Sequence, residues 1–124
     1  MLTNSYKILP LNNDLSARSD NISELGDATI ALSELKKYGK IVTLSASVTV
    51  SSNLNANTWL DIFQLPSGFI PTNSQSRCPF VTRSNKVCGL TRFNPNYPQN
   101  VQMYVATTYT ANDPIDINFT YILN

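Results

Sequence analysis

Apolar and polar side chains alternate strictly along one segment near the middle of the chain, between Gly39 and Val50. The apolar positions are Val42, Leu44, Ala46, Val48 and Val50, and the positions between them are Thr43, Ser45, Ser47 and Thr49. A period of two sends one set of side chains to each face of a strand, as in an antiparallel sheet that is covered on one side. The pattern therefore predicts a strand with one buried face and one wet face.

The sequence after Val50 consists of short apolar segments separated by turn residues. A second strand is expected to end near Pro66, where Pro66, Gly68 and Pro71 predict a rigid corner. The later segments are expected to form a hairpin over 78–93, a loop over 93–100, a strand over 101–110, a turn over 111–114 and a closing strand over 115–123. About six or seven strands with no helical period between them predict an all-β fold, an antiparallel β-sandwich.

Residues 1–38 have a different pattern, in which isoleucine or leucine recurs at intervals of three and four. The eight positions at this spacing are Ile8, Leu11, Leu15, Arg18, Ile22, Leu25, Thr29 and Leu32, and six of them are isoleucine or leucine. The spacing is typical of a coiled-coil seam, which would need further copies of the chain because short isolated helices are marginal in water. The alternative is a loose, extended tether with one helix from Asp27 to Tyr38, capped by Asp27 and stopped by Gly39. Either way, a stalk or tether over residues 1–38 is expected to precede a sandwich head over residues 39–124.

Charge and hydropathy narrow the range of partners. The chain has 9 basic and 8 acidic residues and a net charge of +1. No basic stripe is visible, so nucleic acid is not an expected partner. No apolar run approaches the roughly 20 residues needed to span a bilayer, so membrane insertion is not expected. The N-terminal residues lack the pattern of a secretion signal, and we expect the protein to be made and used without secretion.

The cysteine and carboxylate content argues against metal binding and catalysis. Cys88 is expected to face Val81 across the hairpin, out of register with Cys78, which favours free, buried thiols over a disulfide. The sequence has no histidine, so the usual triads and zinc sites are not expected. Residues 39–124 contain only three carboxylates, Asp61, Asp113 and Asp116, and no pair suited to sugar hydrolysis is indicated. We therefore expect no enzymatic activity and no cofactor.

Three segments of the sequence together resemble a known protein family. They are GKIVTLSASVTV, then WLDIFQLPSGFIP, then DINFTYIL at the end. The C-terminal heads of bacteriophage tail-fibre and baseplate receptor-binding proteins are similar: a G-x-[IV]-V-x-L strand precedes an I-x-x-LP-x-G-[FY]-x-P element, and an aromatic-rich strand closes the chain. The matching residues are Gly39, Ile41, Val42 and Leu44, then Ile62, Leu65, Pro66, Gly68, Phe69 and Pro71, then Phe119 and Tyr121. The likeness covers roughly residues 39–124.

The resemblance implies a jelly-roll-like head in a homotrimer. It further implies attachment to other virion tail proteins through the N-terminus, and recognition of a host cell-surface polysaccharide or other glycan. The expected location is the virion, in a tail fibre or baseplate, after synthesis in the bacterial host cytoplasm. A purely structural virion protein, such as a fibre tip, collar or capsid decoration, is the alternative function.

Saccharide binding needs an aromatic surface for the apolar sugar face and planar polar groups for the hydroxyls, carried by loops on a rigid scaffold. The loop over 93–100 and its surroundings fit that need. The candidate saccharide-binding residues are Arg92, Asn94, Asn96, Tyr97, Gln99 and Tyr104, with Tyr109 as a possible extension. Trp59 is expected in the core, with contact to a neighbouring subunit as the alternative. Apolar side chains on nominally wet strand faces, at Ile41, Leu60 and Ile122, fit a trimer.

Overall fold

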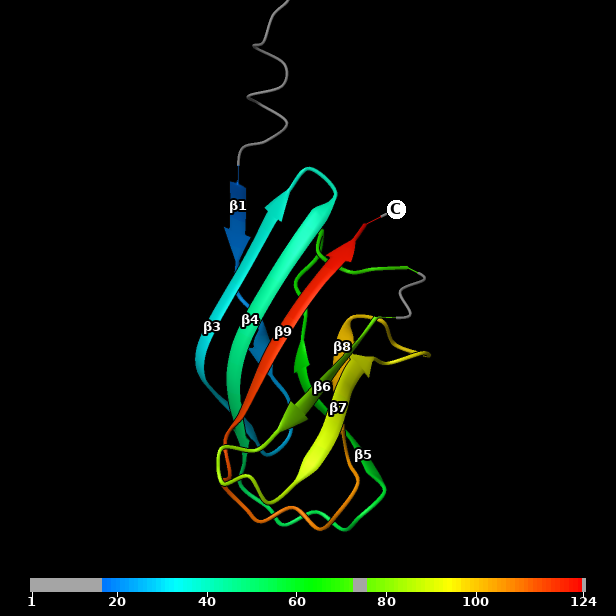
Figure 1. The fold of residues 1–124 in the computed structure, drawn as a ribbon. Coiled ribbons are helices and arrows are strands. Elements are labelled where there is room, and N and C mark those ends of the chain that lie inside the picture. The colour runs from blue at the N-terminus through cyan, green and yellow to red at the C-terminus, as the bar shows by residue number, and fades with distance from the viewer. Residues whose placement is uncertain (1–16, 73–75, 124) are drawn as a thin grey trace, which may run out of the picture.

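The computed structural model describes residues 17–72 and 76–123, which form nine β-strands. The strands are β1 (Ala17–Asp20), β2 (Ser23–Glu24), β3 (Ala28–Tyr38), β4 (Ile41–Val50), β5 (Thr58–Gln64), β6 (Arg77–Val81), β7 (Cys88–Phe93), β8 (Asn100–Val105) and β9 (Ile115–Ile122). In the described part of the chain, no helix has the length and apolar character needed to cross a membrane. The fold is all-β, as the turn-separated segments predict (Figure 1).

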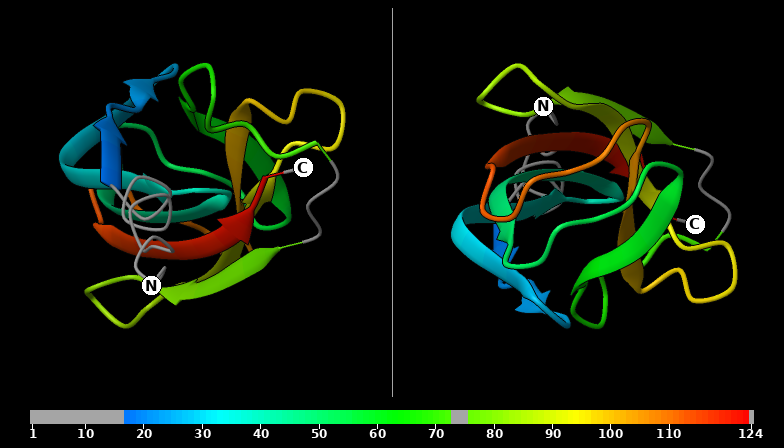
Figure 2. Two further views of the ribbon diagram at one scale, coloured as in Figure 1. Left: turned by 90° about the horizontal axis from the view of Figure 1, so that it is seen from above. Right: turned by 90° about the horizontal axis from the view of Figure 1, so that it is seen from below.

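The strands make two antiparallel sheets with a shared core. Sheet A has the order β1-β3-β4-β9, and sheet B has the order β2-β5-β8-β7-β6. Seen from either end, the sheets enclose a common interior, and β6 of sheet B runs beside β9 of sheet A (Figure 2). Two antiparallel sheets around one interior are consistent with the β-sandwich expected from the sequence.

The alternating segments occupy the positions that their pattern predicts. β4 pairs with β3 on one side and with β9 on the other, at the centre of sheet A. The apolar residues of β4 from Val42 to Val50 are buried, and β9 alternates buried and exposed residues along its whole length. Period-two segments bury one face because every second side chain points to the same side of the sheet. Their burial in the shared core supplies the main apolar contribution to stability.

The helix expected from Asp27 to Tyr38 is wrong, because Ala28–Tyr38 is strand β3 and pairs with β4 along its length. A β-bulge between Ile30 and Leu32 adds one residue, so the inward side switches from even-numbered to odd-numbered positions. This change of parity hides the strand period and imitates the three-four spacing of a helix. The coiled-coil seam is likewise wrong from residue 17 onward, since the described residues there form strands and turns. Residues 1–16, which carry the start of that seam, lie outside the described residues.

The corner expected after β5 is confirmed. Gly68 has a φ of 88°, and the Phe69 amide donates to the Pro66 carbonyl at 3.2 Å, which closes the turn. Lys37 of β3 donates its ammonium to the Gly68 carbonyl at 2.8 Å and lies 4.6 Å from the centre of the Phe69 ring. The corner is therefore fastened to sheet A by a charged hydrogen bond and a cation–π contact.

The β6–β7 hairpin has the expected register, with Val81 opposite Cys88 and Cys78 opposite Thr91. Both cysteines are free, as expected from this offset. Their expected burial is wrong, since Cys88 is exposed and Cys78 is half-buried. Cys88 lies on the outer face of sheet B, where no described segment covers the hairpin.

Two of the three apolar residues expected on wet faces are exposed. Ile41 and Ile122 are direct cross-strand partners on the outer face of sheet A and are 50% and 68% exposed. Leu60 is different, because it is half-buried and packs against the core. A second β-bulge, between Asp61 and Phe63, marks the point on β5 where the facing of side chains changes.

Candidate functional site

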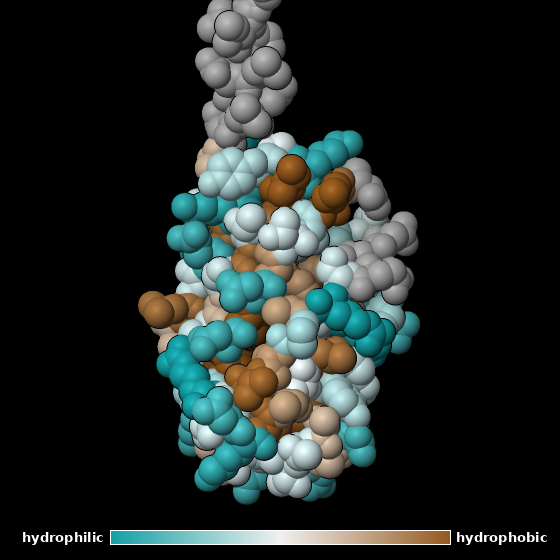
Figure 3. Space-filling model, in the orientation of Figure 1, coloured by the Kyte–Doolittle hydropathy of each residue, from teal (hydrophilic) through white to brown (hydrophobic). Residues whose placement is uncertain are grey.

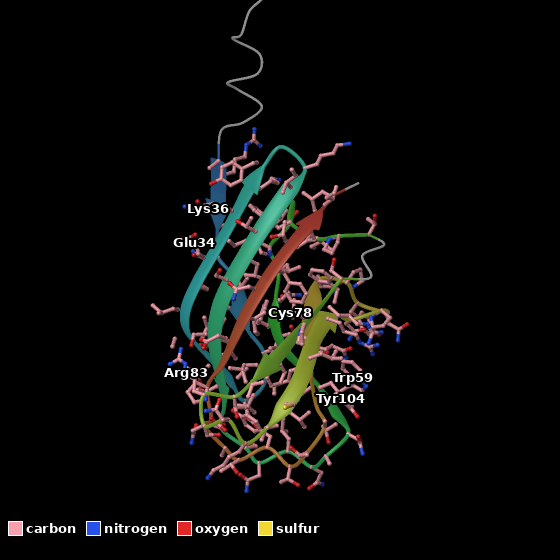
Figure 4. All side chains as sticks on the ribbon, in the orientation of Figure 1. Glu34, Lys36, Trp59, Cys78, Arg83 and Tyr104 are labelled. Carbon is pink, nitrogen blue, oxygen red and sulfur yellow. The ribbon has the colours of Figure 1, made fainter. Side chains whose placement is uncertain are left out.

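The outer face of sheet B carries an aromatic pair on its two central strands. Trp59 of β5 and Tyr104 of β8 are direct cross-strand partners. Their ring centroids are 4.8 Å apart and the planes are tilted by 43°. Figure 4 shows the two side chains next to each other, on the far side of the molecule from Glu34 and Lys36. Trp59 remains 36% exposed, so its expected place in the core is wrong.

Arg92 of β7 completes this cluster. Its guanidinium carbon lies 3.7 Å from the centre of a Trp59 ring, and its Nε donates to Gln102 Oε1 at 3.1 Å. A cation at this position is attracted by the ring quadrupole. Burial lowers the pKa of Arg92, and the like charge of Arg77 lowers it further. Arginine is so strongly basic that the guanidinium stays charged. We call Trp59, Tyr104 and Arg92 the platform.

A hydrogen bond from the adjoining turn orients Tyr104. The Tyr104 hydroxyl donates to Oδ1 of Asn57, which precedes β5. Asn57 has a φ of 65° in a turn, a conformation that asparagine tolerates better than most residues. Two contacts thus hold the platform: Arg92 of β7 stacks on Trp59, and Asn57 in the turn before β5 accepts from Tyr104.

The loop between β7 and β8 is built around Asn94, which is buried. Its Nδ2 donates to both carboxylate oxygens of Asp61, at 3.2 and 3.3 Å. Its Oδ1 accepts from the amides of Asn96 and Tyr97, at 2.9 and 3.2 Å. Asn100 Nδ2 donates to Asp61 Oδ2 at 3.0 Å on the other side of the loop. Asp61 therefore anchors both ends of the loop to β5.

The structure assigns different places to the predicted site residues. Arg92 and Tyr104 belong to the platform. Asn96 and Tyr97 are exposed at the tip of the loop, and 59% of Tyr97 is accessible. Asn94 supports the loop from within, and Gln99 is half-buried with its carbonyl accepting from the Leu65 amide at 2.7 Å. Tyr109 is fully buried, so it cannot extend a binding surface.

Trp59 is the site residue that sequence reasoning missed. The segment TWLDIF contained a sign of its exposure: Trp59 and Asp61 are two residues apart, so their side chains point to the same side of the strand, opposite to Leu60. Parity with an aspartate indicates the wet face of a strand, whereas the usual burial of tryptophan indicates the core. The local pattern was the better guide here.

The outer face of sheet A has a shallow depression of about 390 Å³, lined among others by Leu32, Ser47, Arg83 and Asp116. Arg83 comes from the β6–β7 turn and donates to Asp116 Oδ1 at 2.7 Å and Oδ2 at 3.1 Å. The terminal nitrogen Nη2 that donates to Asp116 Oδ1 also donates to Ser47 Oγ, at 2.8 Å. The hydrogen bond from Arg83 lowers the pKa of Asp116. Because each charge satisfies the other, the depression is a weaker candidate for ligand binding than the platform.

The described residues hold no cluster of three or more metal-ligating side chains, and Asp61, Asp113 and Asp116 belong to separate hydrogen-bond networks. The platform offers flat aromatic surface next to cationic N–H donors, which suits binding rather than bond breaking. No protein-family model matches the chain, and no curated protein sequence matches it. The function is therefore argued from the platform and the loop beside it.

Proposed function

We propose that the protein binds a saccharide on the outer face of sheet B, through the platform. The observation that carries this proposal is the exposed Trp59, paired with Tyr104 and covered on one side by Arg92. Tryptophan is buried in most folds, and an aromatic surface at the wet face of a sheet commonly marks a binding site. Sugar rings have apolar faces that pack on such a surface, while arginine donates to their oxygens.

The surrounding contacts favour binding because they are made before a ligand arrives. Tyr104 is oriented by Asn57, Arg92 is held by Gln102, and the loop is held by Asp61. Groups that are already ordered lose little conformational entropy on binding. Tyr97 and Asn96 at the loop tip add a second aromatic ring and an amide, the two kinds of group that saccharides need.

The biological setting that we propose is host attachment by a bacteriophage. Residues 39–124 resemble the heads of tail-fibre and baseplate receptor-binding proteins, which supports a jelly-roll-like head that binds a host cell-surface glycan. In this proposal the head is a homotrimer in the virion, and residues 1–16 connect it to other tail proteins.

A second candidate function is a purely structural role in the virion, without receptor binding. An apolar row on the outer face of sheet A favours it: Tyr38, Ile41 and Ile122 are cross-strand neighbours and are all exposed. Such a row suits contact with protein rather than with sugar. In this alternative the outer face of sheet B also contacts other virion parts.

A panel of immobilised glycans, probed with purified protein, tests the proposed function. We expect the wild type to bind at least one glycan and Trp59→Ala to weaken that binding about tenfold or more, which corresponds to roughly 1.4 kcal/mol. Trp59 is the only tryptophan, so the same glycan in solution should change the intrinsic fluorescence. Leu32→Ala is the control, because it removes a large exposed side chain from the outer face of sheet A, outside the apolar row. Equal binding by wild type and Trp59→Ala, or binding of no glycan, would contradict the proposal.

A further inference from the structure

Two arginines lie side by side next to the platform. Arg77 of β6 and Arg92 of β7 are direct cross-strand partners on the outer face of sheet B. Like charges directly opposite each other in an antiparallel pair destabilise it. Burial lowers the pKa of Arg92 most, and the positive charge of Arg77 lowers it further. The fold thus keeps an unfavourable pair of cations at this place.

The described part of the chain supplies no carboxylate to this pair. Within residues 17–72 and 76–123, the ion pairs are Lys36–Glu34 and Arg83–Asp116, both outside sheet B's outer face. Asp61 lies in the same cross-strand row, but Gln102 separates it from Arg92. Its oxygens already accept from the amides of Asn94 and Asn100. Asp61 therefore supports the loop instead of neutralising the arginines.

Most N–H donors of the pair remain available. Arg92 uses its Nε for Gln102, and in the described structure neither its terminal nitrogens nor the guanidinium of Arg77 make a hydrogen bond. Arg83 provides the contrast within the same molecule, because its guanidinium donates to Asp116 and Ser47. The guanidinium of Arg83 is thus neutralised by a carboxylate, that of Asp116. Among the described residues, no acid pairs with Arg77 or Arg92, and the Trp59 ring lies against Arg92.

We propose that the ligand of the platform is an anionic saccharide, with its sugar ring against Trp59 and its carboxylate or phosphate between Arg77 and Arg92. This inference rests on the proposed function and adds the chemical class of the ligand. A planar guanidinium binds a carboxylate or phosphate with two parallel hydrogen bonds, and two guanidinium groups surround such an anion from two strands. A bound anion also reduces the repulsion between the two cations. The favourable free energy of binding is therefore larger than the direct contacts of the anion alone would give.

The test uses matched pairs of immobilised glycans. Polygalacturonate is paired with its carboxyl-reduced neutral form, and a phosphorylated mannan with its dephosphorylated form. We expect wild-type protein to prefer the anionic member of at least one pair about tenfold or more. The pair that shows the preference identifies the group as carboxylate or phosphate. The preference should shrink between 50 and 300 mM salt, at roughly the ionic strengths where screening becomes strong.

Variants separate a built site from general attraction of polyanions. Arg77→Gln should abolish the preference while keeping the melting temperature, because Arg77 is exposed. Arg18→Gln is the matched control: it removes the same charge from an exposed position on β1 in sheet A and should keep the preference. Trp59→Ala should weaken binding of the anionic glycan as well.

Each contrary outcome has a defined meaning. Equal binding of anionic and neutral forms that still depends on Trp59 would overturn this inference and leave the proposed function in place. A preference that persists in Arg77→Gln, or binding of the anionic glycan that is undiminished in Trp59→Ala, would show non-specific attraction and overturn it too. Binding of no glycan would overturn both.

Discussion

Single residues of one type have opposite roles in this protein, and tyrosine is the clearest case. Tyr104 and Tyr97 contribute aromatic surface to the proposed site, whereas Tyr109 and Tyr121 are buried. The Tyr109 hydroxyl donates to the Asp113 carbonyl at 2.6 Å and accepts from the Val50 amide at 3.2 Å. The Tyr121 hydroxyl donates to the Phe69 carbonyl at 2.7 Å. The buried pair satisfies backbone groups that would otherwise lack partners.

Burial of Tyr121 has a consequence at alkaline pH. Burial raises the pKa of Tyr121 above its usual value, because the phenolate is disfavoured in the core. The folded-state pKa therefore exceeds the unfolded value of about 10, so stability is complete below pH 10 and is lost as the pH rises further. We expect the melting temperature to fall more steeply above about pH 10 in the wild type than in Tyr121→Phe. Parallel pH curves for both proteins would contradict this explanation.

At the scale of elements, strands β7 and β8 approach each other unusually closely at Gly89. A Cβ atom built at Gly89 would lie 2.0 Å from the Tyr104 carbonyl oxygen and 2.6 Å from Cζ of Phe80. The first is backbone of a neighbouring strand and the second is a core side chain, so neither can move away easily. Glycine at this position is what permits the register that sets Tyr104 beside Leu90 and Trp59.

We expect Gly89→Ala to lower the free energy of unfolding by at least about 2 kcal/mol, because overpacking forces the strands or Phe80 to shift. Gly26→Ala is the matched control. No atom lies within 4 Å of its Cβ position, but its φ of 56° strains alanine, for about 1 kcal/mol. Urea denaturation of both variants gives the comparison. Similar losses for the two variants would show that the contact at Gly89 relaxes without cost.

At the scale of the whole molecule, the two outer faces differ in chemistry. Sheet B carries the platform, and sheet A carries the apolar row of Tyr38, Ile41 and Ile122 at the end where β1 begins. Figure 3 shows apolar side chains, in brown, near this end on the face of the molecule turned to the viewer. A different partner is therefore expected for each face, a glycan for sheet B and protein for sheet A.

We predict that the protein is a homotrimer in solution and that the apolar row contributes to its interface. Ile41→Ser combined with Ile122→Ser should shift the mass measured by light scattering towards the monomer, because exposed apolar area drives association. Leu32→Ser is the control, since Leu32 is 73% exposed on the same sheet but outside the row. A monomeric wild type at micromolar concentration would contradict the prediction. Deletion of residues 1–16 tests whether the N-terminal segment also holds the trimer together.

The sequence alone determined the features that depend on local pattern. The strict alternation in 41–50 and 115–122 specified strands with known buried faces, because side chains on a strand point to opposite sides in turn. Proline and glycine specified the corner at Pro66–Gly68, because few residues adopt its backbone angles. The loop over 93–100 was also predictable, since its prolines and asparagines exclude a regular strand.

Only the tertiary structure decided the features that depend on which strands become neighbours. The bulge in β3 reversed the alternation, and pairing with β4 made a strand of residues whose spacing suggested a helix. Trp59 is exposed because no described segment covers sheet B at that point, which no local pattern specifies. The register of the β6–β7 hairpin places Arg77 opposite Arg92. Strand β8 pairs with both β5 and β7, and this brings Arg92 within reach of Trp59 on one face of sheet B. The platform is a product of sheet order, and sheet order is set by burial of the whole core rather than by any one segment.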